Sequence, residues 1–303
     1  METSRDAAAH VPAADAASPG RRGGERLGGV ALMLGSGLSN QFGASVAALA
    51  FPVIGPVGVV AVRQWMAAGV LWAVGRPRLR SFTAAQWRPV LGLALVFAAM
   101  NTSLYQAVDR IGLGLAVTLE FLGPLTVALT TSRRRIDALC ALAAAGAVAV
   151  LARPSPSTDY LGIGLALLAA ASWGCYVLLN RAVGRRLPGL EGSAAAAAVS
   201  GALYLPVGAL VLWHHPPTAV ALACALAAGV LSSAVPFLSD LLALRRVPAH
   251  FFGVFMSVNP VFAGLVGMLV LGEHLDALSW AAVLVIVAAN AVVVTAPYPA
   301  RSR

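Results

Sequence analysis

The segment Arg110–Arg135 reads RIGLGLAVTLEFLGPLTVALTTSRRR and decides the fold. Its carboxylate, Glu120, stands ten residues into an otherwise apolar run that contains Pro124 and ends in three arginines. An ionisable group in hydrocarbon costs roughly 2.5–3.5 kcal/mol on membrane-insertion scales, so such groups mark functional positions. The segment therefore predicts a membrane-crossing helix that carries the chemistry of a transporter.

The composition of the whole chain agrees with a membrane protein. Of its 303 residues, 59% are hydrophobic and 11% are charged, and the mean hydropathy is +0.82. Soluble domains have about 25% charged residues. Apolar segments recur at about 20 residues, the length that crosses a bilayer's hydrocarbon layer. We therefore expect an all-α polytopic membrane protein embedded in a lipid bilayer.

The net charge of +9 would also suit a nucleic-acid partner. The basic residues are all arginines, however, and they lie in short loops between apolar runs, so no nucleic-acid partner is expected. The three cysteines each lie inside an apolar segment without metal-ligand spacing. The sequence therefore predicts no disulfide framework, no metal and no cofactor.

Ten membrane-spanning helices are expected between a disordered cytoplasmic tail, 1–27, and a short cytoplasmic tail, 297–303. The spans are 28–51, 57–75, 88–108, 111–132, 136–152, 160–180, 193–213, 218–244, 248–271 and 277–296. If the N-terminus is cytoplasmic, every arginine except Arg63, Arg110 and Arg153 lies in a tail or an inner loop. The positive-inside rule therefore places both termini in the cytoplasm.

A spacing in the first half of the chain recurs in the second half. Arg110 and Pro124 are separated by the same interval as Arg246 and Pro260. Because five spans precede the midpoint, the copies run in opposite directions. We therefore expect two inverted five-helix repeats, 28–152 and 160–296, with a binding site near the membrane midplane, as in many secondary transporters.

Two opposite charges are expected at similar depths. On upright helices Glu120 lies about 14 Å and Arg63 about 9 Å below the outer boundary. In the functional interpretation they face one cavity, where Arg63 holds a substrate carboxylate by its planar fork. Glu120 then receives an ammonium group or the coupling proton. The alternative is a fixed ion pair that only stabilises the bundle.

Polar groups and helix breakers complete the candidate site. Near the same depth lie Asn40, Asn101 and Tyr105, which either contact a zwitterion or join neighbouring helices. Pro124 and Pro260 interrupt their helices, and the freed carbonyls either line the cavity or mark static kinks. In the second copy Met256 occupies the position of Glu120, with Ser257 and Asn259 beside it.

Other residues are interpreted more locally. Asp240, near the inner end of its span, is either part of an inner gate or the partner of a neighbouring arginine. Trp173 either walls the cavity or packs the bundle. Glu273 falls in an outer loop, where a solvated turn is expected. The sequence contains no HExxH motif, phosphate-binding loop or nucleophile elbow, so we expect no enzyme and a transporter driven by an ion gradient.

Four runs carry a family resemblance, and together they imply a known fold. They are SNQFGASVAALAFPVIGPVGVVAVRQ (39–64), MNTSLYQAVDRIGLGLAVTLEFLGPLTVALTTSRRRID (100–137), LSSAVPFLSDLLALRRVP (231–248) and FMSVNPVFAGLVGMLVLGE (255–273). They resemble the EamA family of the drug/metabolite transporter superfamily, and most of all its bacterial threonine and homoserine exporter group. The group tends to carry Glu near Asp240, which is a departure here.

The resemblance implies ten helices in two inverted repeats and export of small amino acids, by proton antiport and alternating access. The chain would then lie in the bacterial inner membrane, either alone or as a homodimer. One rival is the same fold exporting other metabolites or drugs. A second rival, a non-transporting membrane scaffold or an intramembrane enzyme, has no motif in its favour.

Overall fold

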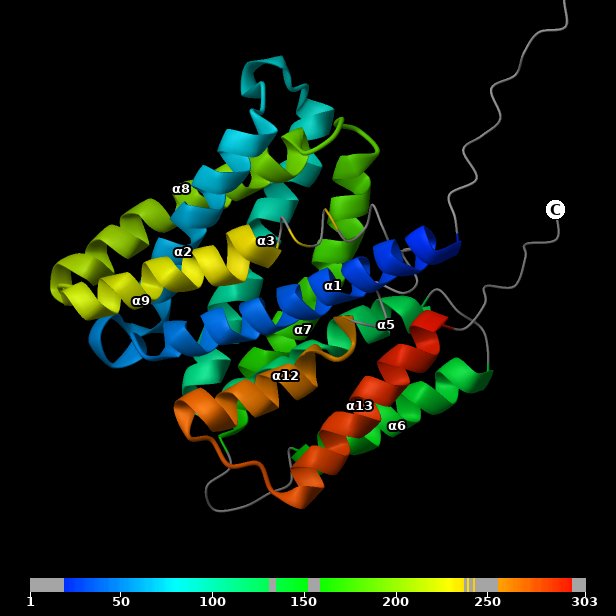
Figure 1. The fold of residues 1–303 in the computed structure, drawn as a ribbon. Coiled ribbons are helices and arrows are strands. Elements are labelled where there is room, and N and C mark those ends of the chain that lie inside the picture. Colours follow the sequence, from blue (N-terminus) through cyan, green and yellow to red (C-terminus); the bar gives the residue numbers. More distant parts are fainter. Residues whose placement is uncertain are drawn as a thin grey trace, which may run out of the picture.

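The computed structural model describes residues 19–130, 135–151, 159–236, 239, 242 and 256–295. Every regular element in these ranges is helical, which confirms the all-α class (Figure 1). The candidate gate residue Asp240 and the residues 1–18 and 296–303 lie outside the described ranges.

The described residues of the first half form six α-helices and one short 3₁₀ turn. They are α1 (Pro19–Ala48), α2 (Phe51–Gly75), η1 (Leu79–Ser81), α3 (Ala84–Ile111), α4 (Leu113–Glu120), α5 (Leu122–Thr130) and α6 (Arg135–Leu151). Among these helices, the starts that differ most from the expected ones are those of α1, at Pro19, and α2, at Phe51. Helix α2 has a kink near its start at Gly55, which precedes Pro56. The φ of Gly55 is 67°, a value that is readily available only to glycine.

The second half contains a similar series. Its described elements are α7 (Tyr160–Gly184), α8 (Glu191–His214), α9 (Ala219–Gly229), the π-helix η2 (Val230–Ala234), α12 (Asn259–Val266), the π-helix η3 (Gly267–Leu271) and α13 (Ala277–Thr295). Among the described helices, α2, α3, α7 and α8 are long and apolar enough to cross a membrane, and the other apolar ones are shorter. The count of ten spans stays a prediction.

Helices from the two halves pack in pairs. Helix α3 packs on α7, α2 on α8, α6 on α13, α4 on α12 and α1 on α9 (Figure 1). Where α2 crosses α8, Gln64 Nε2 donates to Ser200 Oγ at 2.7 Å and Trp65 Nε1 donates to the Gly201 carbonyl at 3.1 Å. Both pairs are separated by 136 residues, which is the interval between the two copies in the sequence.

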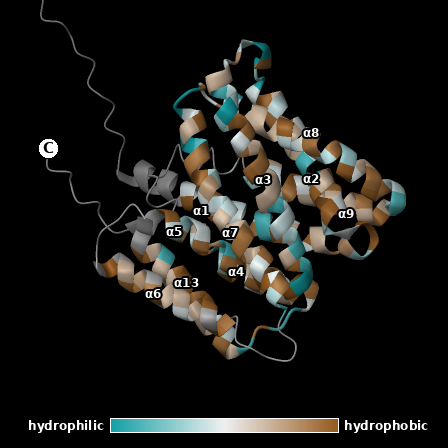
Figure 2. Ribbon diagram, turned by 180° about the vertical axis from the view of Figure 1, so that it is seen from behind, coloured by the Kyte–Doolittle hydropathy of each residue, from teal (hydrophilic) through white to brown (hydrophobic). Residues whose placement is uncertain are grey.

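Small residues fill the contacts between helices, and large apolar ones face outward. The residues Ala194–Ala197 of α8 are each no more than 4% exposed. In contrast Leu95, Leu142 and Leu269 are 59%, 70% and 83% exposed, and hydrophobic residues colour most of the helix surface (Figure 2). Small residues between the helices and large apolar residues on the outside suit hydrocarbon surroundings, because helices in a membrane associate through close backbone packing.

One end of the bundle is fastened by Asp159, which precedes α7. Its Oδ1 accepts a hydrogen bond from the Gly162 N–H at 2.8 Å, and its Oδ2 pairs with Arg110 Nη1 of α3 at 3.0 Å. The backbone hydrogen bond from Gly162 and, next, the bond from Arg110 lower the pKa of this carboxyl below its usual value.

Removing the charge of Asp159 is expected to lower thermal stability in a pH-dependent way. A carboxylate whose pKa is lower in the folded state stabilises that state above its unfolded pKa, and the gain disappears as the pH falls through the folded pKa. The difference in melting temperature between the unaltered protein and Asp159→Asn should therefore be largest at neutral pH and shrink toward about pH 3. Thermal melts in detergent measure it, and a pH-independent difference would contradict the assignment.

Candidate functional site

Two proline-induced breaks place backbone and side chains at the centre of the molecule. Pro124 lacks the N–H that would bond to the Glu120 carbonyl, and the helix is interrupted between α4 and α5. Pro260 acts in the same way on the Met256 carbonyl, which instead accepts a hydrogen bond from Asn259 Nδ2 at 3.0 Å. The predicted interruptions are therefore present in both halves.

A cavity of about 130 Å³ lies beside these breaks. Its described polar lining consists of Asn40, Gln41, Arg63, Tyr105, Glu120 and Asn259. Helices α1, α2, α3, α4 and α12 each contribute to this set. Met256, the counterpart of Glu120 in the second half, also lines the cavity. The structure thus brings the two predicted charges to the wall of one space.

The guanidinium of Arg63 is held from two sides. It lies over the Tyr105 ring, with Cζ 5.0 Å from the ring centroid, in a cation–π arrangement. Its Nη2 also donates to the Ser232 carbonyl of η2 at a long 3.4 Å. These contacts fix the direction of the group while leaving other N–H groups for a ligand, since a guanidinium has five donors.

The carboxylate of Glu120 is 6% exposed and lines the same cavity. Within the described part of the chain it accepts no hydrogen bond, and no Arg63–Glu120 contact falls within the 4.0 Å of an ion pair. The alternative interpretation of the sequence, a fixed ion pair between Arg63 and Glu120, is therefore not realised in this conformation. A buried carboxylate and a half-buried guanidinium that line one cavity leave a space between them for a ligand with both charges.

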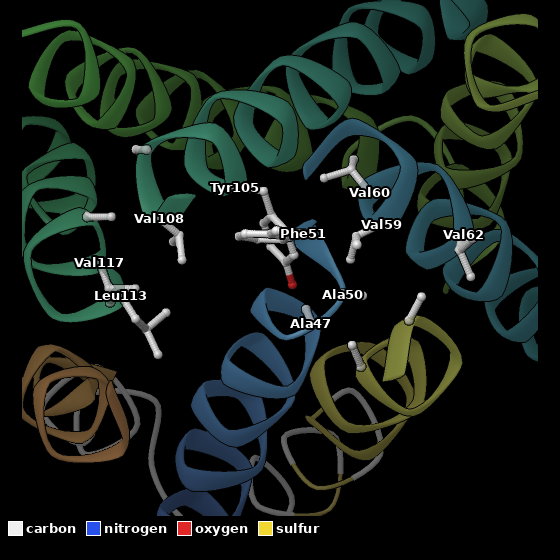
Figure 3. Packing of buried hydrophobic residues seen from close by; sticks show 14 of the residues in the cluster. Ala47, Ala50, Phe51, Val59, Val60, Val62, Tyr105, Val108, Leu113 and Val117 are labelled. Atoms are coloured by element: carbon white, nitrogen blue, oxygen red, sulfur yellow. The ribbon is translucent and has the colours of Figure 1, made fainter. Parts of the chain in front are cut away.

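Two further polar atoms point to a ligand. Tyr105 Oη and Asn259 Oδ1 are buried and have no hydrogen-bond partner among the described residues. Tyr105 is 1% exposed and lies among apolar side chains such as Phe51 and Val108 around the central space (Figure 3). Because an unpartnered buried polar atom costs about 1–3 kcal/mol, a ligand that supplied partners here would bind more tightly.

An aromatic pair closes one side of the cavity. The rings of Phe121 and Trp173 meet edge to face, with centroids 4.7 Å apart, and both residues line the cavity. The pair can form because α5 approaches α7 closely, and a Cβ on Gly123 would collide with the Ala170 carbonyl. Trp173 therefore lines the cavity and also packs against the buried core of the bundle.

Several predicted residues lie elsewhere. Asn101 is buried, but its Nδ2 donates to the Phe97 carbonyl of its own helix at 2.8 Å, and it is not among the described lining residues. Ser257 is buried at the second break, and Pro124 and Pro260 shape the breaks without lining the cavity. Gln41, which the sequence analysis did not single out, is 2% exposed and lines the cavity.

The expectation of a solvated turn at Glu273 is wrong. Its carboxylate accepts the N–H of Leu113 at 2.6 Å and the N–H of Gly114 at 3.2 Å, and so caps the N-terminus of α4. A carboxylate is stabilised there by the free amide groups and the helix dipole. No local pattern could indicate this contact, because its donors are backbone groups about 160 residues away.

A bundle of apolar helices around a small cavity with two opposite charges defines a membrane transporter. The chain belongs to the EamA-like transporter family, whose profile matches residues 160–295.

Curated relatives extend the likeness over most of the chain. The threonine/homoserine exporter RhtA of Salmonella typhimurium (strain LT2) is 36% identical over 259 residues, which cover 83% of this chain and 86% of that protein. RhtA of Escherichia coli (strain K12) is 34% identical over 268 residues, covering 86% and 89%. A crystal structure of a protein 18% identical superposes with a TM-score of 0.57, covering 90% of this chain and 97% of that one, a likeness of fold alone.

Proposed function

We propose that this protein exports small amino acids of the threonine or homoserine type across the bacterial inner membrane. The observation that carries the proposal is the placement of Arg63 and Glu120 on one cavity wall without a direct ion pair. The names of the two relatives, threonine/homoserine exporters, support the substrate class.

A zwitterion fits the charges of this cavity. The substrate carboxylate would accept hydrogen bonds from the planar fork of Arg63, which suits carboxylates in two-point contact. The ammonium group would bind Glu120. A hydroxyl on the substrate side chain would supply partners for Tyr105 Oη and Asn259 Oδ1, the two unpartnered atoms whose residues line the cavity.

The size of the cavity favours a small substrate over a drug. Pockets for drug-sized ligands measure ~300–1,000 Å³, whereas this cavity measures about 130 Å³. Among the described lining residues, the aromatic ones are Tyr105 and the pair Phe121 and Trp173. A same-fold exporter of other small metabolites remains the nearest alternative, and drugs fit the site less well.

Coupling to protons follows from the same carboxylate. In the proposed cycle Glu120 binds either the substrate ammonium or a proton, so that the two compete and move in opposite directions. Pairing of each helix with a partner in the other half supports inverted repeats and alternating access across the cavity. Both termini would lie in the cytoplasm, as the arginine distribution favours.

Expression of the chain in a bacterium deprived of its own amino-acid exporters tests the function. Cells that produce the protein should tolerate higher external threonine or homoserine and release more labelled threonine after loading. The matched control is the Arg63→Gln variant at equal membrane abundance. Tolerance and release no higher than in cells that lack the protein would contradict amino-acid export, and a screen of other metabolites would then decide among the remaining substrates.

A further inference from the structure

One contact joins the two halves of the molecule next to the cavity. Glu273 follows η3 in the second half, and the N–H groups that it receives, those of Leu113 and Gly114, begin α4 in the first half. Leu113 itself lines the cavity. The carboxylate therefore lies directly behind a residue of the cavity wall, at the end of the cavity where α3 turns into α4.

The surroundings of this carboxylate are shaped to receive it. Gly112 has a φ of 83°, and a Cβ on it would lie 2.9 Å from the Glu273 carboxyl carbon. A Cβ on Gly267 would collide with Glu273 Oε2, and the Glu273 N–H donates to the Gly267 carbonyl at 3.2 Å. Because these two glycines lack a Cβ, the Glu273 side chain has the space that it occupies. An incidental contact of a loop residue would not need such a space.

Helices α4 and α12 are in close contact beside the carboxylate. A Cβ on Gly114 would lie 3.0 Å from the Gly264 Cα, so the two backbones approach through glycines. Helix α4 ends at Glu120, where the break before α5 begins. The helix that carries the proposed coupling residue is therefore a short rigid unit, held at its other end by Glu273.

We propose that Glu273 is a positioning residue for transport, which clamps the start of α4 to the second half and so keeps this end of the cavity closed. The proposal rests on the proposed function, because alternating access requires that one end of the cavity opens while the other is closed. Since Glu273 does not line the cavity, it acts through the position of α4 and not by touching the substrate.

Accessibility of the cavity wall tests the clamp without any substrate. Val117 of α4 lines the cavity and is 3% exposed, so a cysteine there reports on opening. Val117→Cys is placed in a background in which Cys140, Cys175 and Cys224 are replaced by alanine. A membrane-impermeant maleimide is applied to each side of sealed vesicles in turn, and the rate of labelling is measured.

Adding Glu273→Gln should raise the labelling rate on the order of tenfold from one side of the membrane only, because the charged acceptor of the amide groups is lost. Gly267→Ala, which occupies the space of the carboxylate but leaves Glu273 unaltered, should have the same effect. The matched control is Glu191→Gln, which makes the same chemical change at a residue that pairs with the exposed Arg78 away from the cavity.

Unchanged labelling from both sides in Glu273→Gln would overturn the clamp, and so would an equal increase in Glu191→Gln. Threonine counterflow with the same variants separates this result from the proposed function. Glu273→Gln should change the maximal rate more than the substrate concentration at half-maximal rate, as expected for a residue that does not touch the substrate. If the unaltered protein does not transport threonine, the proposed substrate is refuted. The labelling result would still test the clamp.

Discussion

Replacement of Glu120 by glutamine is expected to abolish export driven by a pH gradient. Glutamine has the same shape but neither binds a proton nor carries a negative charge for an ammonium group. Loss of a charge-assisted contact of about 1.5–3 kcal/mol corresponds to ~10–100-fold weaker binding. Uptake of labelled threonine into inside-out vesicles, measured with and without an imposed pH gradient, would show low flux that no longer responds to the gradient.

The control for this variant is Glu191→Gln, which makes the same chemical change outside the cavity. Glu191 pairs with Arg78 at 3.1 Å, and the Arg78 side chain is 78% exposed, so the pair contributes little. Flux through Glu191→Gln should keep its response to the gradient. Full, still proton-driven flux through Glu120→Gln would exclude Glu120 as the coupling residue.

Replacement of Arg63 should remove recognition of the substrate carboxylate. The group is oriented by the Tyr105 ring, and its planar fork matches a carboxylate. Arg63→Gln is expected to weaken competition by threonine ~10–100-fold. It should also lose the preference for threonine over threonine amide, which has no carboxylate. Competition of the two compounds against labelled threonine in counterflow measures both effects.

Arg63→Lys separates charge from shape in the same assay. Lysine keeps the positive charge but lacks the planar fork, so its effect should lie between those of the unaltered protein and Arg63→Gln. Arg78→Lys, a matched change at an exposed position, should leave competition unchanged. An Arg63→Gln variant that still prefers threonine to its amide would show that another group binds the carboxylate.

The sequence was sufficient to predict the apolar helices and the main charges of the cavity. Helix rise and the apolar boundaries predicted similar depths for Glu120 and Arg63, and their opposite charges suggested one shared cavity, which both residues line. The two prolines predicted the breaks because each removes an N–H from its helix, although Pro206 lies inside α8 without ending that helix. These inferences depend on properties of single helices, and such properties can be derived from the sequence alone.

The contacts that the sequence did not reveal depend on the arrangement of helices. Asn101 has the expected depth, but its amide bonds to its own helix at the Phe97 carbonyl, an option that any helical asparagine has. Gln41 lines the cavity because α1 is rotated to place it there. Glu273 binds backbone amides of α4, and backbone groups leave no signature in side-chain patterns.

Counterflow of labelled threonine in proteoliposomes tests the central claim most directly. Vesicles that contain the purified protein and unlabelled threonine should accumulate external labelled threonine, and both Arg63→Gln and protein-free vesicles should accumulate little. Homoserine should compete for this exchange, whereas threonine amide should compete weakly. Absence of exchange with the unaltered protein, or equal exchange in Arg63→Gln, would contradict an amino-acid exporter built around Arg63 and Glu120.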